Sequence, residues 1–243
     1  MENLAETKVS KIVAKNYKTA KVFSSYGIDF CCNGGIPLSQ ACEENGADLD
    51  LVLQQLEIEL SSEDKDDVKN YSMPDLVDHI EKNHHDYIRK TAPLLQAYLD
   101  KLCRVHGDRH PELFEIKSIF DVSTESMLSH MNKEESVLFP FIKEMVAGKE
   151  ANKAFETPHF GHIDNPIAMM EDEHTEEGDR FREISRLTNS YKAPADGCQT
   201  YRVAFSILEE YEQDLHRHIH LENNILFIKA KQLFQEMTAG SPA

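Results

Sequence analysis

The sequence predicts an all-α protein in which a small helical N-terminal domain precedes an antiparallel four-helix bundle. Helix-breaking residues are few, with 10 glycines and 9 prolines among 243 residues. After residue 72, four long segments repeat apolar residues with the period of a helix. The loops between these segments are modest in length, which favours antiparallel neighbours in a bundle.

Composition and charge narrow the class of protein. Hydrophobic residues make up 40% of the chain and charged residues 28%, which is typical of a soluble globular protein. No apolar run approaches the roughly 18 residues of a membrane span, and the N-terminus lacks the basic start and apolar stretch of a signal peptide. A net charge of −17 argues against a nucleic-acid partner. Five irregularly spaced cysteines form no disulfide framework, so we expect a reducing, cytoplasmic location.

We expect three parts along the chain. Residues 1–60 form the small helical domain, which carries the turn-rich segment GIDFCCNGG with Cys31 and Cys32. Residues 61–71 are polar and charged and are expected to be a linker. Residues 72–243 form the bundle, with Ser72 as the N-cap candidate of its first helix. The four helices are expected at 72–103, 111–146, 163–188 and 200–237.

Histidine and glutamate interrupt the apolar stripes of three of these helices. His130 and Glu134 lie one turn apart on the buried face of the second helix, and His218 and Glu222 repeat this spacing on the fourth. His174 interrupts the stripe of the third helix. A buried carboxylate needs a cation or a proton to offset its desolvation. One inward histidine is usually an ordinary core residue, but two His-x-x-x-Glu pairs with a third histidine predict a metal site.

The first helix offers three histidines, and the residues alone leave the choice open. His79, His84 and His85 all lie on it. The apolar period favours His84 and places His85 toward the edge of the stripe, which runs through Leu76, Ile80, Tyr87, Thr91 and Leu94.

The donor set points to two metal ions. Four imidazoles and two carboxylates exceed the needs of one tetrahedral zinc, whereas mixed nitrogen and oxygen donors suit a pair of iron or manganese ions with carboxylate bridges. Ferritin-like bundles use Glu-x-x-His, and the order here is His-x-x-x-Glu. The order and spacing therefore favour a hemerythrin-like arrangement.

With these motifs together, the chain resembles the iron–sulfur cluster repair di-iron proteins of the ScdA/YtfE type (RIC) over nearly its whole length. The resemblance is carried by GIDFCCNGG near the N-terminus and by SHMNKEESVLFP, EDEH and HIHLENNILF in the bundle. It implies a hemerythrin-like di-iron centre whose two iron ions share an oxo or hydroxo bridge. The implied ligands are His85, His130, Glu134, His174, His218 and Glu222, with Glu134 and Glu222 each bridging both ions. In the first helix it thus selects His85 over His84.

The resemblance also implies a function. The protein is expected to help restore iron–sulfur clusters damaged by nitric oxide or oxidants, by donating iron or processing NO, with Cys31 and Cys32 as a relay near the surface. Its partners are then damaged iron–sulfur proteins, and NO or O₂ is its small ligand. Two alternatives stay open, a hemerythrin-like sensor or carrier of O₂ or NO, and a di-iron NO reductase or oxidase. The sequence does not decide whether the protein is an enzyme, nor whether it forms a homodimer.

Overall fold

A computed structural model describes residues 3–61, 67–153 and 155–239. Within these ranges every regular element is a helix, and Lys8 and Pro37 form the one isolated β-bridge. The predicted all-α class is confirmed. None of the helices in these ranges is both long and apolar enough to cross a bilayer. The chain divides into two compact units, one of residues 1–76, 145–156 and 219–243 and the other of residues 77–144 and 157–218.

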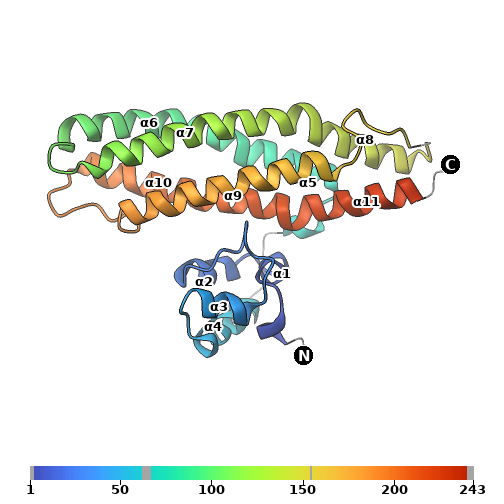
Figure 1. The fold of residues 1–243 in the computed structure, drawn as a ribbon, viewed down its shortest axis with the longest axis horizontal. Helices are drawn as coiled ribbons and strands as arrows, with labels where there is room; N and C mark the ends of the chain where they lie inside the picture. The colour runs from blue at the N-terminus through green and yellow to red at the C-terminus, as the bar shows by residue number, and fades with distance from the viewer. Residues whose placement is uncertain (1–2, 62–66, 154, 240–243) are drawn as a thin grey trace. The chain divides into compact units, whose positions relative to one another are not determined.

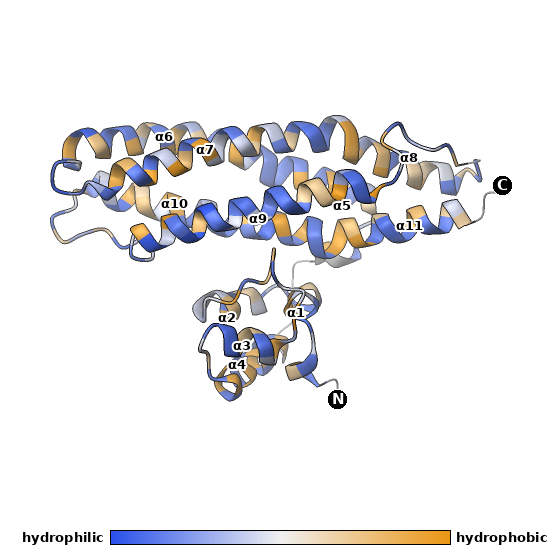
Figure 2. Ribbon diagram, viewed as in Figure 1, coloured by the Kyte–Doolittle hydropathy of each residue, from blue (hydrophilic) through white to orange (hydrophobic). Residues whose placement is uncertain are grey.

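The second unit contains the middle of a four-helix bundle. Its helices are α6 (Asp86–His106), α7 (Glu112–Lys133), α9 (Asp164–Leu187) and α10 (Gln199–Leu221). They run along one another in Figure 1, and α7 packs against both α6 and α9. Hydrophobic and hydrophilic residues alternate along each of them in Figure 2, the pattern of helices with one buried face.

Three of the four expected bundle helices contain a π-helical turn. The first consists of α5 (Met73–Ile80), η3 (Glu81–His85) and α6, and the second of α7, η4 (Glu134–Leu138) and α8 (Phe139–Glu150). The last consists of α10, η5 (Glu222–Leu226) and α11 (Phe227–Ala239). A π-turn takes in one extra residue, so the side chains that follow it are rotated by about 100°.

This rotation changes which residues face the core. After η3 the buried face of α6 includes Ile88, Leu95 and Leu99, whereas Leu94 is 47% exposed. The stripe expected through Tyr87 and Leu94 is therefore wrong by one position. The prediction assumes one helical period from α5 to α6, and the π-turn η3 interrupts that period.

Aromatic side chains from all four helices contact one another in the bundle core. Phe120 of α7 contacts Phe181 of α9 and Tyr211 of α10 edge to face, with ring centroids 6.5 Å and 5.4 Å away. Phe181 stacks on Tyr211, and Tyr211 also meets Tyr87 of α6. All three residues of the central trio are fully buried. This layer closes the bundle core next to the polar centre.

The first unit contains the N-terminal helices. They are η1 (Leu4–Glu6), α1 (Val9–Lys15), α2 (Thr19–Ser25), α3 (Leu38–Glu44) and α4 (Leu49–Ser61). The segment with the paired cysteines lies between α2 and α3. A Cβ at Gly34 would come within 2.5 Å of the Phe30 carbonyl oxygen, so only glycine allows this tight turn.

Ser72 caps the first bundle helix, as predicted. Its hydroxyl accepts from the backbone amide of Asp75 and donates to the Asp75 carboxylate. Of the expected linker, residues 62–66 lie outside the described residues, and Asp67–Asn70 form the short 3₁₀ helix η2.

The aromatic layer yields a stability prediction. Phe120→Ala should lower the free energy of unfolding by roughly 3–5 kcal/mol, because it empties a buried ring site in the bundle. Phe114→Ala is the matched control on the same helix, since Phe114 is 56% exposed, and it should cost less than about 1 kcal/mol. Chemical denaturation of both variants measures the difference. Equal losses would show that the layer does not stabilise the bundle.

Candidate metal centre

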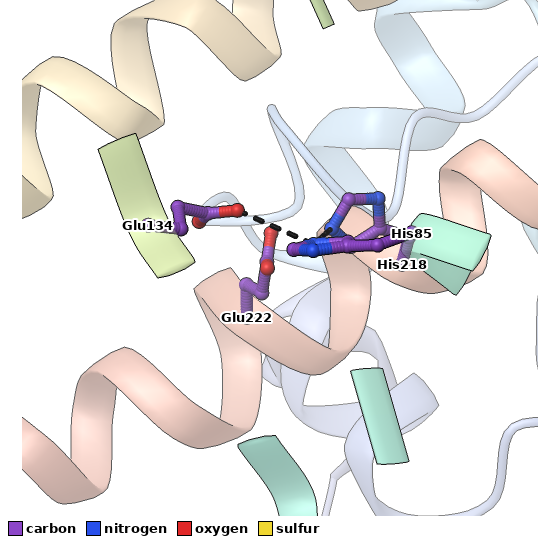
Figure 3. A group of neighbouring side chains, drawn as sticks. All are labelled: His85, Glu134, His218 and Glu222. Atoms are coloured by element: carbon purple, nitrogen blue, oxygen red, sulfur yellow. Dashed lines mark hydrogen bonds and ion pairs between the residues drawn. The ribbon is translucent and has the colours of Figure 1, made fainter. Parts of the chain in front are cut away.

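Two groups of side chains in the bundle core have the composition and spacing of metal sites. One is His85, Glu134, His218 and Glu222, and the other is His130, Glu134, His174 and Glu222. In each group one donor atom per residue lies within 4.8 Å of the others, and every member is buried. Figure 3 shows the side chains of the first group pointing toward one another. The buried histidines and glutamates are therefore compatible with a metal centre.

The imidazole nitrogens meet in two close pairs. The Nε2 atoms of His85 and His218 are 3.1 Å apart, and those of His130 and His174 are 3.0 Å apart. Two imidazoles on one first-row ion, with bonds of about 2.1 Å at a right angle, place their nitrogens about 3.0 Å apart. The observed spacings fit that arrangement in both pairs.

Two carboxylates are common to both groups. An Oε2 atom of Glu134 lies 3.4 Å from His85 Nε2 and 3.3 Å from His130 Nε2, so one oxygen faces both histidine pairs. Glu222 is likewise a member of both groups. Glu134 begins η4, and its carbonyl accepts the i+5 hydrogen bond from Phe139; Glu222 begins η5 in the same way, with Phe227 as donor. Both shared carboxylates thus stand at π-turns, which often occur at functional sites.

The structure separates the two histidines between which the sequence left a choice. His85, the last residue of η3, belongs to the first group, and His84 belongs to neither. His84 stacks nearly parallel on His218 with ring centroids 5.8 Å apart. Its Nδ1 lies 2.9 Å from an oxygen of Asp214. His84 therefore lies next to the centre and packs on one of its histidines.

Glu135 orients His85 from outside the centre. An oxygen of Glu135 lies 2.7 Å from His85 Nδ1, and Arg89 donates to both oxygens of the same carboxylate at 2.8 Å. Burial opposes ionisation of Glu135, but the hydrogen bonds from His85 and Arg89 outweigh it and lower its pKa. An ionised acceptor at Nδ1 keeps the imidazole proton there and leaves the Nε2 lone pair directed into the centre.

Glu173 has the same role at His130. Its Oε2 lies 2.8 Å from His130 Nδ1, and Lys133 forms an ion pair with its other oxygen. The hydrogen bond with His130, supported by Lys133, lowers the pKa of Glu173 to about 2. Both histidines that face Glu134 are therefore oriented by an ionised carboxylate on their far nitrogen.

Glu177 of α9 is buried next to the centre but belongs to neither group. It accepts a hydrogen bond of 2.7 Å from the Ser123 hydroxyl and pairs with Arg180. Burial raises the pKa of Glu177 despite these two partners. A cavity of about 330 Å³ is lined by Glu177, Arg180, Lys133, Glu173 and His130, among others. Of the grouped residues, His130 alone lines this cavity.

Asp29, Cys31 and Cys32 form a third group, in the first unit. Burial opposes ionisation of Asp29, but the backbone amides of Cys32, Cys31 and Asn33 outweigh it and lower its pKa. The hydrogen bond with Cys32, followed by burial, raises the pKa of the Cys31 thiol well above its usual range. Cys32 is half-buried, whereas Cys31 is only 5% exposed. The expectation that both thiols lie near the surface is wrong for Cys31, because the tight turn folds it inward.

Sequence reasoning missed the orienting carboxylates. Glu135 and Glu173 each stand directly next to an expected ligand in the chain, at Glu134 and His174. An acidic residue beside a ligand was the available signal, but both serve a histidine on another helix. Only the packing of helices identifies which imidazole they orient. His159 and His162 are exposed and belong to neither group.

Comparison with known proteins identifies relatives for both parts of the chain. Residues 5–59 match a domain of unknown function, DUF542 (ScdA_N), and residues 76–230 match the hemerythrin HHE cation binding domain. The chain is 30% identical to the iron-sulfur cluster repair protein ScdA of Staphylococcus haemolyticus over 92% of its own length and 97% of the relative.

Two further relatives carry similar names. A probable iron-sulfur cluster repair protein of Haemophilus influenzae is 31% identical, over 93% of this chain and 96% of the relative. The iron-sulfur cluster repair protein YtfE of Salmonella paratyphi B is 31% identical, over 88% and 91% respectively. The similarity thus spans both matched domains, and the relatives are matched almost in full.

The position of the two neighbouring histidines gives a direct prediction. His85→Ala should reduce the metal content of the purified protein strongly, because it removes a member of the first group. His84→Ala is the matched control, since it removes a stacked neighbour and leaves both groups complete. Metal analysis per folded chain compares them. A loss in His84→Ala equal to that in His85→Ala would contradict the assignment.

Proposed function

The chain belongs to the family of iron–sulfur cluster repair proteins that includes ScdA and YtfE, and from this premise we propose that it restores clusters damaged by nitric oxide or oxidants, with a pair of iron ions in the bundle. The observation that carries the proposal is the sharing of Glu134 and Glu222 by two histidine pairs. Mixed nitrogen and oxygen donors of this kind suit two iron ions bridged by carboxylates.

In this proposal each ion has two imidazoles and both shared carboxylates. His85 and His218 would hold one ion, His130 and His174 would hold the other, and Glu134 and Glu222 would be shared by both. When bound, the pair supplies ferrous iron and one-electron chemistry with small molecules. Two imidazoles per ion leave coordination positions open, which favours reaction and exchange over simple reversible binding of O₂.

The surrounding residues keep the centre ready to hold and release iron. Glu135 and Glu173 hold the protons of His85 and His130 on Nδ1, so both imidazoles offer Nε2 without prior deprotonation. The polar cavity at His130 supports access for a ligand as small as NO or O₂. Lys133 and Arg180 along it offset part of the acidic charge of its walls.

Delivery of iron to a client requires a ligand outside the buried core, and we assign this to Cys31 and Cys32. Thiolates are soft ligands that accept iron readily, and free thiols persist in the reducing cytoplasm that we assign to this protein. The clients are iron–sulfur proteins, in keeping with the names of the relatives. The domain boundaries expected above, with the thiols before residue 61 and the ligands after residue 72, divide the chain between delivery and storage.

The bridging assignment predicts a shared loss of iron. Glu134→Gln and Glu222→Gln should each lower iron from two ions per chain to one or fewer, because a neutral amide cannot balance the charge of both ions. Glu177→Gln is the matched control, a buried glutamate in the same bundle that belongs to neither group, and it should keep both ions. Iron analysis with circular dichroism decides the outcome. Full iron in Glu222→Gln would sink the bridging role.

The repair function has its own test. The full-length Cys31→Ser/Cys32→Ser variant should keep two irons but fail to restore the activity of a nitrosylated or oxidised iron–sulfur enzyme. Cys42→Ser/Cys198→Ser is the control and should repair at the rate of the natural chain. Measuring N₂O in the same anaerobic assay separates iron donation from catalytic NO reduction. Repair at an undiminished rate by the first variant would refute the relay.

A further inference from the structure

We propose that Asp29, Cys31 and Cys32 form a second metal site, which binds one thiophilic divalent cation separately from the centre in the bundle. One donor atom of each of the three side chains lies within 4.8 Å of the other two. The two Sγ atoms are 3.7 Å apart, and Cys31 Sγ is 3.4 Å from Asp29 Oδ1. The domain that contains them has no assigned function in its family description.

These separations match the edges of a tetrahedral site. With metal–sulfur bonds of about 2.3 Å and metal–oxygen bonds of about 2.0 Å, two thiolates on one ion lie about 3.8 Å apart and a thiolate and a carboxylate oxygen about 3.5 Å apart. The observed 3.7 Å and 3.4 Å differ from these values by about 0.1 Å. Two of the three edges therefore already have the lengths of a metal site, and the third lies within 4.8 Å. The two thiol protons leave to solvent as the metal–sulfur bonds form.

The turn is built so that the three groups stay together. Asp29 Oδ1 accepts from the backbone amides of Cys31 and Cys32 at 3.0 Å and 2.9 Å, and its Oδ2 accepts from the Asn33 side chain at 3.0 Å. The close approach of Gly34 to the Phe30 carbonyl fixes the other end of the turn. The carboxylate is thus held by the same residues whose thiols it faces, which reduces the entropy lost when an ion binds.

The site suits transfer of an ion better than permanent storage. Three protein ligands leave the fourth tetrahedral position open, as in zinc sites that exchange a ligand, whereas structural sites are closed by four. Cys32 is half-buried whereas Cys31 is buried, so Cys32 is the more accessible of the two thiols. A client thiolate or a small ligand can occupy that position.

The same turn is joined to the helix that carries Glu222. Within the first unit, the side chain of Asn223 donates to the Cys31 carbonyl and that of Asn224 to the Phe30 carbonyl, each at 3.2 Å. Asn223 directly follows Glu222 in η5. The turn that carries the thiols is thus hydrogen-bonded to the residue that directly follows Glu222, a proposed ligand of the bundle centre. Naming the ion as ferrous iron rests on the proposed function, whereas the site itself rests on the three side chains.

Cobalt(II) is a suitable probe, because a cobalt–thiolate bond gives a charge-transfer absorption that nitrogen and oxygen ligands in the bundle do not. The iron-loaded, full-length protein is titrated with Co²⁺ under anaerobic, reducing conditions. We expect one equivalent to bind with this absorption. Cys32→Ser should abolish the band, and Asp29→Asn, which keeps an oxygen for the backbone amides, should weaken binding at least tenfold. Cys198→Ser, which removes the exposed thiol of the bundle, should change nothing.

The outcomes separate this proposal from the function proposed above. Absence of the band in the natural chain overturns the second site, and so does its persistence in Cys32→Ser or its loss in Cys198→Ser. Unchanged affinity in a folded Asp29→Asn, checked by circular dichroism, overturns the role of the carboxylate. If the natural chain shows the full cobalt band, Cys32→Ser lacks it, and Cys32→Ser still repairs at the full rate, the metal site stands. Only its part in iron delivery is then refuted.

Discussion

The burial of two shared carboxylates among four imidazoles is the constraint on which the rest of this structure depends. Glu134 and Glu222 are fully buried, and a buried ionised carboxylate costs several kcal/mol unless a positive charge lies next to it. The four histidines direct nitrogens at the same points. Metal ions satisfy both sets of groups together. Phe120, Phe181 and Tyr211 form a fully buried aromatic layer in the same bundle.

This constraint also explains the π-turns. An α-helix presents residues four apart with a small angular offset, and each of these helices must direct its site residues at points shared with the other three. The π-turns at His85, Glu134 and Glu222 adjust the direction of one side chain in each helix at the level of the centre. A wider turn has poorer backbone hydrogen bonding. Its presence three times at one level indicates that the geometry of the centre outweighs the regularity of the helices.

The sequence therefore predicted the bundle and the inward-facing pairs well, but not the register at the turns. His130 with Glu134 and His218 with Glu222 were found by spacing, because each pair ends at the first residue of a π-turn and precedes the change of register. The apolar period favours His84, whereas the grouped residue is His85, because the π-turn η3 interrupts that period. The family resemblance selected His85, since it compares residues directly and needs no assumption about helical period. Glu135 and Glu173 were out of reach, since their partners lie on other helices.

The two proposed metal sites differ in chemistry in a way that favours one direction of transfer. The bundle centre offers hard oxygen and intermediate nitrogen donors inside a rigid core, which suits ions that are stored in pairs. The Asp29 turn offers two soft sulfur donors and an open position, which resembles the thiolate environment of an iron–sulfur cluster more than that of the bundle. In the proposed transfer, an ion released from the carboxylates would pass to softer ligands before it reaches a client cluster. Asn223 connects these two environments, because it follows Glu222 in the chain and holds the backbone of Cys31.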